Sequence, residues 1–464
     1  MKRITIFFAL MLSICISAQA KLVPSSLFSD GMVLQQNTNA KIWGKADPGS
    51  QISVTTSWNG ATYRAKTDKE GHWTIYASTP SASYKPYTVT IKGDGQTIRI
   101  NDVLIGEVWF ASGQSNMEMP MCGYYNCPVE NALEYISAPA AKNKIRMFKV
   151  HQNQTYEPLE DVENSRWEGA DSYSIPYMSA VAYFFARELN EMLDIPVGIL
   201  SCAYGGARIE SWLPKEILET YPDEDLSKEH IESLIHYHRP YLAYNAMFTP
   251  LKGYTAKGFI WYQGCSNVGK HDQFCDRMTT LVNHWRECWG DSEAKLPFYM
   301  VEIAPYRYKP QQPVSYASLL RQAQHDAAKA IPNSGIVVTN DLVELLPDGR
   351  FRVLGRRDNV VCSGGVKLQI EELERKLSEV ISVPFLLTYV SDERLGQALT
   401  MLYTGDALPS ELQQLCTERV GRYEVPKHFF HISQLPMTET GKPARSMAHQ
   451  VAAEFYKMHS ISKN

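Results

Sequence analysis

Between residues 102 and 339 the chain alternates short apolar runs with longer stretches of helical periodicity, and this order limits the fold more than any other feature. The apolar runs are 103–111, 196–203, 257–262, 298–303 and 335–339. The helical stretches between some of them are 179–192, 276–289 and 316–331. This order predicts an α/β domain with a mostly parallel sheet covered by helices, in which the functional loops lie at the carboxyl ends of the strands.

The segments on either side of this domain have a different pattern. Residues 21–101 contain short alternating runs separated by Gly, Asp, Asn and Pro, which predicts a small β-sandwich. All nine tryptophans lie at or before Trp289, and an amphipathic helix is predicted at 371–377. We therefore predict four parts: a signal peptide (1–20), a β-sandwich (21–101), the α/β domain (102–340) and a small α+β domain (341–464).

The first twenty residues have the pattern of a secretory signal. Lys2 and Arg3 precede an apolar run at 4–16, and Ala18-Gln19-Ala20 forms a small-x-small cleavage site. A retained, uncleaved anchor is the alternative. No later stretch approaches the roughly 20 apolar residues of a membrane-spanning helix, so we expect a secreted or periplasmic protein without a membrane span.

Charge and cysteine spacing exclude several classes of partner. A net charge of −4 gives no field that would gather nucleic acid, which favours a neutral small molecule or a glycan. No CxxC pair and no Cys/His spacing matches a zinc site, so neither a metal nor a cofactor is predicted. Cys122 and Cys127 are close enough in sequence to form a disulfide, although scattered free thiols explain them equally well. The oligomeric state is not predicted.

Three segments that follow apolar runs carry residues suited to acyl transfer. Ser115 comes after the run 103–111 and a Gly-containing turn, Gly205 and Gly206 follow the run 196–203, and Asn267 follows the run 257–262. Attack on an ester carbonyl builds negative charge on one oxygen, and each prealigned donor there lowers the barrier by roughly 3 kcal/mol. We predict Ser115 as the nucleophile, with its own N–H, the Gly205–Gly206 turn and the Asn267 amide as the oxyanion hole. Each residue alone is also explained as a turn, a cap or a surface position.

Together these segments resemble the sialate O-acetylesterase family of SGNH hydrolases. The motifs are Gly-Gln-Ser-Asn-Met at 113–117, Gly-Gly-Ala-Arg-Ile-Glu-Ser-Trp at 205–212 and Trp-Tyr-Gln-Gly-Cys-Ser-Asn at 261–267. The resemblance covers about 22–341, and Cys265 stands where many relatives have Glu. It implies an SGNH-hydrolase-like sheet and removal of acetyl groups from sugar hydroxyls, typically of O-acetylated sialic acid, through an acetyl-serine intermediate.

The resemblance also implies a catalytic histidine, in an Asp-x-x-His segment after the strand that corresponds to 335–339. None of the twelve histidines has Asp three residues before it. A serine needs an adjacent base to become a nucleophile, so we predict weak or absent catalysis. His271, in a loop near Asn267, is a possible substitute base, and His236 and His238 lie in another possible loop.

The last 120 or so residues resemble the C-terminal domain of acyl-adenylating enzymes, most closely o-succinylbenzoate–CoA ligase. The matching segments are 345–358, 362–368 and 440–445. The resemblance implies a hinge that contains Arg356 and Asp358, a Gly364–Gly365 loop near the CoA arm, and a charge-neutralising role for Lys442. The large ATP-binding domain of that family has no counterpart here, and a lysine cannot act on a phosphate that no domain holds.

Both resemblances meet in the string Val-Thr-Asn-Asp-Leu-Val-Glu at 338–344. We infer a fusion across this string, by recombination or by the joining of two sequence fragments, rather than a selected bifunctional enzyme. The reason is that a signal peptide exports the chain whereas ATP and CoA chemistry is cytoplasmic. Three hypotheses follow: a weakened esterase, a noncatalytic glycan-binding relic, and an orphan ligase subdomain. Acetate release from an O-acetylated sugar separates the first two, and ATP-dependent CoA ester formation would support the third.

Overall fold

The computed structural model describes residues 22–125, 127–129, 132–137, 144–304, 315–338, 341–345, 351–356, 359–437 and 443–461. The predicted signal peptide, Asp358 and Lys442 lie outside these residues. The chain forms two compact units: the first ends at Val337, and the second comprises the residues from Val338 onward together with a short segment that starts at Ala304. No helix in the described ranges is long and apolar enough to cross a membrane.

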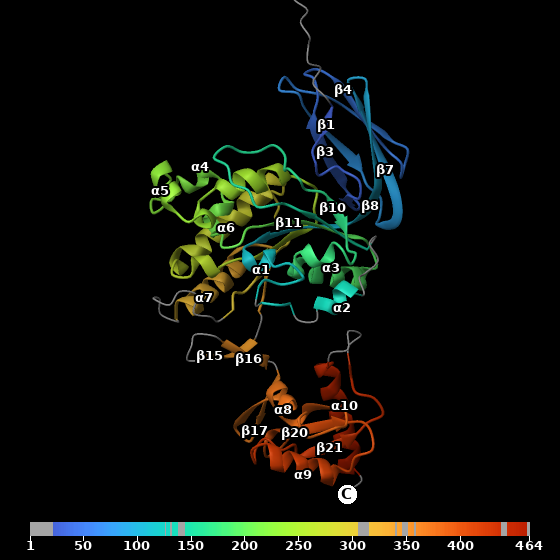
Figure 1. Ribbon diagram of the computed structural model, residues 1–464, viewed down its shortest axis with the longest axis vertical. Helices are drawn as coiled ribbons and strands as arrows, with labels where there is room; N and C mark the ends of the chain where they lie inside the picture. The colour runs from blue at the N-terminus through green and yellow to red at the C-terminus, as the bar shows by residue number, and fades with distance from the viewer. Residues whose placement is uncertain are drawn as a thin grey trace, which may run out of the picture. The chain divides into compact units, whose positions relative to one another are not determined.

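The predicted parallel sheet is present in unit 1 (Figure 1). Its strand order is β10-β9-β11-β8-β12-β13-β14, and all neighbours are parallel except the edge pair β10 and β9. The strands are β8 (Gln96–Gly113), β9 (Ile145–Lys149), β10 (Trp167–Gly169), β11 (Val197–Ala203), β12 (Gly258–Tyr262), β13 (Phe298–Val301) and β14 (Ser334–Val337). The predicted α/β class is therefore confirmed, while the short strands β9 and β10 were not predicted.

Alternating side chains of the central strand enter two different cores. Val108 and Phe110 of β8 join one hydrophobic cluster, whereas Trp109 and Ala111 join the other. This is the period of two expected for a strand that is covered on both faces. The helices α1 (Ser115–Glu118) and α3 (Ala180–Leu193) contribute to the second cluster, and α6 (His271–Cys288) and α7 (Ser315–Ala330) contribute to the first. The two pairs of helices therefore cover opposite faces of the sheet.

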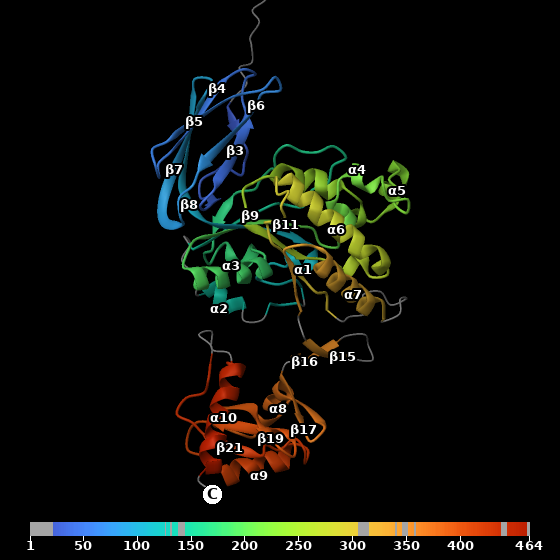
Figure 2. The same ribbon diagram turned by 180° about the vertical axis from the view of Figure 1, so that it is seen from behind.

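The predicted β-sandwich precedes this sheet and shares a strand with it (Figure 2). One of its sheets has the order β1-β3-β6, while β2, β4, β5 and β7 belong with β8. These strands are β1 (Val23–Pro24), β2 (Val33–Gln35), β3 (Asn39–Lys45), β4 (Gln51–Thr56), β5 (Thr62–Lys66), β6 (His72–Ser78) and β7 (Ser83–Gly93). Because β8 continues through residues 101 and 102, the predicted sandwich boundary falls inside one strand.

Unit 2 is a small α+β fold, as the resemblance implies. Its sheet has the order β18-β17-β20-β19, with β21 paired to β20, and a separate hairpin joins β15 to β16. The strands are β15 (Asp341–Leu345), β16 (Phe351–Arg356), β17 (Val360–Ser363), β18 (Val366–Gln369), β19 (Phe385–Asp392), β20 (Gly396–Tyr403) and β21 (His428–His431). The helices are α8 (Ile370–Leu377), α9 (Pro409–Arg419) and α10 (Arg445–Ile461). The predicted helix at 371–377 corresponds to α8.

A buried ion cluster connects the loops at the carboxyl edge of the parallel sheet. Glu210, in a short 3-10 helix (Ile209–Trp212), has a fully buried side chain and pairs with Arg277 of α6, whose side chain is 1% exposed. Arg277 also binds Glu224 at 2.6 Å. Burial raises the pKa of Glu210, but Arg208 and Arg277 outweigh it and hold that pKa below its ordinary value. The carboxylate is therefore ionised and fixes the position of both chain segments.

Glycine is required where β8 approaches β12. Gly113 has φ +144°, and a Cβ atom there would lie 2.2 Å from the Tyr262 carbonyl oxygen. We expect Gly113→Ala to lower the free energy of unfolding by roughly 2 kcal/mol or more, because strain and overpacking add. Urea unfolding followed by tryptophan fluorescence measures this in unit 1, which contains all nine tryptophans.

The matched control is Gly60→Ala, since Gly60 has φ +70° but no atom within 4 Å of the added Cβ. The Gly60→Ala variant should lower the free energy of unfolding by only about 1 kcal/mol, because it adds backbone strain alone. Equal losses for the two variants would show that the β8–β12 approach is not sterically limited.

The ion cluster predicts a pH-dependent stability. Glu210→Gln removes one of the buried negative charges that balance Arg208 and Arg277, so we expect a loss of stability on the order of 3 kcal/mol at pH 7. A lowered folded pKa stabilises the protein above the unfolded pKa, and this contribution disappears as the pH falls through the folded value. The stability gap between native protein and variant should therefore close below about pH 4. Exposed Glu163→Gln is the control, and a gap that stays constant from pH 7 to pH 3.5 would contradict the assignment.

Candidate active site

The three segments predicted to form the site meet at the carboxyl ends of three neighbouring strands. Gly113 at the end of β8 pairs with Ala203 at the end of β11 and with Tyr262 at the end of β12. Ser115, the Gly205–Gly206 turn and the loop 263–267 follow directly. The parallel register of the central strands therefore brings the predicted nucleophile beside both predicted donor loops.

Ser115 is the first residue of the short helix α1 and is partly exposed. Gln114 connects it to the neighbouring loop, because its Oε1 accepts from the Gly264 N–H at 3.0 Å and from the Ser266 N–H at 3.4 Å. The Tyr124 hydroxyl donates to the Ser115 carbonyl at 3.1 Å. The Ser115 N–H lies in the first turn of α1, where N–H groups have no intrahelical acceptor. The turn is held on both sides while the serine remains accessible.

The Gly205–Gly206 turn lies against Ser115. A Cβ atom on Gly205 would be 4.0 Å from the Ser115 Cβ, and on Gly206 it would be 2.5 Å from the Tyr237 ring. Gly206 has φ +79°, which favours glycine, and its carbonyl accepts from the Ser266 hydroxyl at 2.8 Å. The Gly205 N–H donates to the carboxylate of Glu118. The two glycines thus provide the close approach that the predicted site needs.

Asn267 is buried and holds its loop in place. Its Oδ1 accepts from the Ile209 N–H at 3.1 Å and from Gln263 Nε2 at 2.6 Å. Its Nδ2 donates to both carboxylate oxygens of Glu210, at 3.2 and 3.1 Å. The structure therefore shows a positioning role for Asn267, and its contribution to an oxyanion hole stays a prediction.

Glu118 is a member of this site that the sequence reasoning missed. It is half-buried one helical turn after Ser115, and its Oε1 accepts from Gln152 Nε2 at 2.6 Å. Burial raises the pKa of Glu118, and Gln152, the Gly205 N–H and Lys149 only partly offset this. The signal was present, because residues at i and i+3 share one face of a helix.

None of the described histidine side chains is hydrogen-bonded to the Ser115 hydroxyl. His271 is the first residue of α6 rather than a loop residue, and its Nε2 lies 3.5 Å from Asp272 Oδ1. His236 and His238 form a short 3-10 helix, where the His236 ring lies 6.2 Å from that of Tyr204. His325 of α7 pairs with the buried Glu302 at 2.9 Å. The role of His271 as a substitute base stays a prediction.

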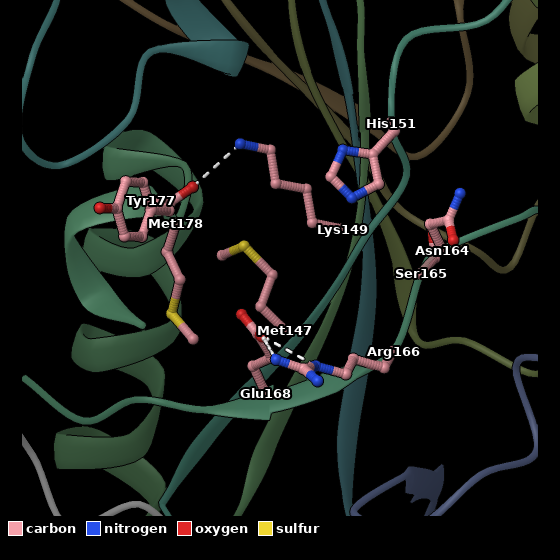
Figure 3. A pocket seen from close by; sticks show the side chains of 9 residues that line it. All are labelled: Met147, Lys149, His151, Asn164, Ser165, Arg166, Glu168, Tyr177 and Met178. Carbon is pink, nitrogen blue, oxygen red and sulfur yellow. Dashed lines mark hydrogen bonds and ion pairs between the residues drawn. The ribbon is translucent and has the colours of Figure 1, made fainter. Parts of the chain in front are cut away.

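A pocket of about 590 Å³ lies at the edge of the sheet, over the ends of β9 and β10 (Figure 3). The Lys149 ammonium at the end of β9 donates to the Tyr177 carbonyl at 3.0 Å, and Arg166 pairs with Glu168 at 3.0 Å. Lys149 also lowers the pKa of Glu118 through its charge. A cation that lines the pocket thus acts on the carboxylate of Glu118, three residues after Ser115.

The remaining predicted site residues lie in unit 2 or away from the catalytic loops. Gly364 and Gly365 form the turn between β17 and β18 with φ of +60° and +85°. Arg356 ends β16. Cys122 and Cys127 are both free thiols in the structure, although the sequence left a disulfide open.

Comparison with known proteins identifies two relationships. The family model for carbohydrate esterase, sialic acid-specific acetylesterase, matches residues 105–349. The sialate O-acetylesterase of Homo sapiens is 30% identical over 302 residues, which is 60% of this chain and 57% of that protein. The chain therefore spans just over half the length of this relative. The crystal structure of a carbohydrate acetylesterase from Xanthomonas citri aligns with a TM-score of 0.60 and 29% identity, covering 68% of each chain.

The end of the chain has a different relative. Tyrocidine synthase 3 of Brevibacillus parabrevis is 34% identical over 107 residues, which is 22% of this chain and 2% of that protein. The partial similarity to adenylating enzymes expected for the C-terminal part is confirmed.

The family model spans more than half of the chain, including Ser115, the Gly205–Gly206 turn and Asn267. The strand order and the three converging loops described above lie within the matched region. This chain belongs to the family of sialic acid-specific acetylesterases among the carbohydrate esterases.

Proposed function

We propose that unit 1 removes O-acetyl groups from sialic acid or a related sugar, with Ser115 as the nucleophile. The observation that carries this proposal is the convergence of Ser115 with the Gly205–Gly206 turn at the ends of adjacent parallel strands. The Ser115 oxygen attacks the acetyl carbonyl carbon, the sugar leaves as its alcohol, and water releases acetate from the acetyl-serine. We further propose a secreted or periplasmic location, on the basis of the charged and apolar residues at 2–20.

The proposed oxyanion hole consists of the Ser115 N–H, the Gly205–Gly206 turn and Asn267. The Asn267 Nδ2 atom carries two hydrogens. If one of them bonds both carboxylate oxygens of Glu210, the other is left for the substrate. Donors that are fixed before the substrate arrives need no reorganisation as the negative charge develops. The buried ion cluster around Glu210 supplies this rigidity on one side of the site.

The proposed activity is slow, because the segment that would carry the family's histidine is replaced. After β14 the chain continues into unit 2, and no Asp-x-x-His segment occurs in it. Serine hydrolases that have lost members of the catalytic triad still react about 10³ to 10⁴ times faster than the uncatalysed reaction in water, because the oxyanion hole and substrate binding remain. We propose at least this residual rate here, to which a base in place of the histidine would add.

A noncatalytic glycan-binding role is the second candidate, and the pocket next to Lys149 favours it. Lys149, the ion pair of Arg166 with Glu168, and the apolar Met147 and Met178 line the same cavity. This mixture of charged and apolar groups suits an acidic sugar. Binding of such a sugar without acetate release would support this candidate, whereas ATP-dependent CoA ester formation would support an orphan ligase function.

Acetate release from O-acetylated sialic acid tests the proposal. We expect the native chain to be at least about 100-fold slower than the Xanthomonas citri carbohydrate acetylesterase, since a triad without its histidine loses most of its advantage. Ser115→Ala should abolish the remaining activity. Ser81→Ala, at an exposed position of the sandwich, should not change it. Turnover equal to that of the Xanthomonas enzyme would refute the impairment, and activity retained in Ser115→Ala would refute the nucleophile.

A further inference from the structure

We propose that Glu118 is the general base of this site and takes the proton from the Ser115 hydroxyl in place of a histidine. This inference rests on the proposed function. Ser115 and Glu118 are the first and last residues of α1, and residues three positions apart lie one above the other on a helix surface. A carboxylate and a nucleophile therefore share one face of a single helical turn.

The glycine opposite this turn shows that both side chains border the same space. A Cβ atom on Gly205 would lie 2.8 Å from Glu118 Oε2 and 4.0 Å from the Ser115 Cβ. Only a residue without a side chain leaves this space open. The Glu118 carboxylate oxygen and the Ser115 side chain thus both lie next to the Gly205 backbone, and the carboxylate is so close that it leaves no room for a side chain there.

Hydrogen bonds fix the carboxylate in this position without occupying all of its acceptor sites. Gln152 Nε2 donates to Oε1 at 2.6 Å, and the Gly205 N–H donates to the carboxylate as well. An ionised carboxylate offers about four lone-pair sites, so capacity remains for the Ser115 hydroxyl. Gln152 is therefore a positioning residue, equivalent to the third member of a triad.

The surroundings of the carboxylate make it a stronger base than a solvated glutamate. Burial raises the pKa of Glu118. Tyr124, whose own pKa is raised to about 12 by burial and by Glu118, and Tyr204 face it from neighbouring loops. The positive charge of Lys149 in β9 lowers the pKa of Glu118 and offsets part of the effect of burial. A base is most effective when its pKa lies near the working pH, and the net upward shift moves Glu118 in that direction.

The proton balance of the reaction closes with this single carboxylate. Glu118 accepts the Ser115 proton as Oγ bonds to the acetyl carbon, and returns it to the sugar oxygen as the acetyl–sugar C–O bond breaks. In deacylation it accepts a proton from water, whose oxygen attacks the acetyl carbon, and gives that proton back to Ser115 Oγ as acetate leaves. No oxidant, metal or second base is required.

The experiment measures the rate at which a fluorophosphonate labels Ser115 in the full chain, from pH 4 to pH 9, by intact-mass spectrometry. We expect the native rate to rise with pH through an inflection above the ordinary glutamate range. Glu118→Gln keeps the size and the contact with Gln152 but cannot accept a proton. It should label about 100-fold more slowly at neutral pH and lose the inflection. Glu118→Asp should retain the inflection at a reduced rate.

Exposed Glu188→Gln on α3 is the matched control and should label as the native chain does. Labelling of Glu118→Gln with the native rate and inflection would overturn the proposal, as would a native chain whose Ser115 does not label. Failure of the proposed function looks different, because Ser115 would then label through Glu118 while no O-acetylated sugar released acetate.

Discussion

The hydrogen bonding of one long strand determines most of unit 1. Strand β8 pairs with β7 and β2 up to Gly106 and with β11 and β12 from Glu107 onward. The sandwich and the parallel sheet are therefore built on the same backbone, and neither can shift without breaking pairs in the other. The strand ends at Gly113, two residues before Ser115, so the position of the nucleophile follows from the register of the sheet. Catalytic geometry is here a direct product of strand pairing.

Apolar periodicity predicted the sheet well because it reports burial on two faces. The run 103–111 predicted the core half of β8, whose successive residues enter two separate clusters. Periodicity could not predict that β8 begins at Gln96, since the residues before 103 alternate as in a half-exposed strand. The short strands β9 and β10 were missed because no distinct turn or helical stretch marked them off. The boundary between the sandwich and the α/β domain was misplaced because one strand belongs to both.

The candidate site was predicted in part for a similar reason. Ser115, Gly205 and Asn267 each follow an apolar run, so their convergence could be read from the order of the strands. Contacts between residues far apart in the sequence could not be predicted in this way. The hydrogen bond between Asn267 and the buried Glu210 is an example. Glu118 was not predicted because the family pattern implies a histidine as the base. Its place three residues after Ser115 on the same helical turn, and the raised pKa of its carboxyl group, are properties that the sequence motif does not report.

The parallel sheet is complete before the chain leaves unit 1. Strand β14 pairs with β13 along its length and ends at Val337, where the unit also ends. Cellular quality control recognises exposed apolar surface rather than catalytic turnover. The core of unit 1 lies within the residues up to Val337, so a change in the sequence after this point would leave that core buried. A fold built in this way can keep its shape while its catalytic loops change, which is a starting point from which a glycan-binding protein can evolve.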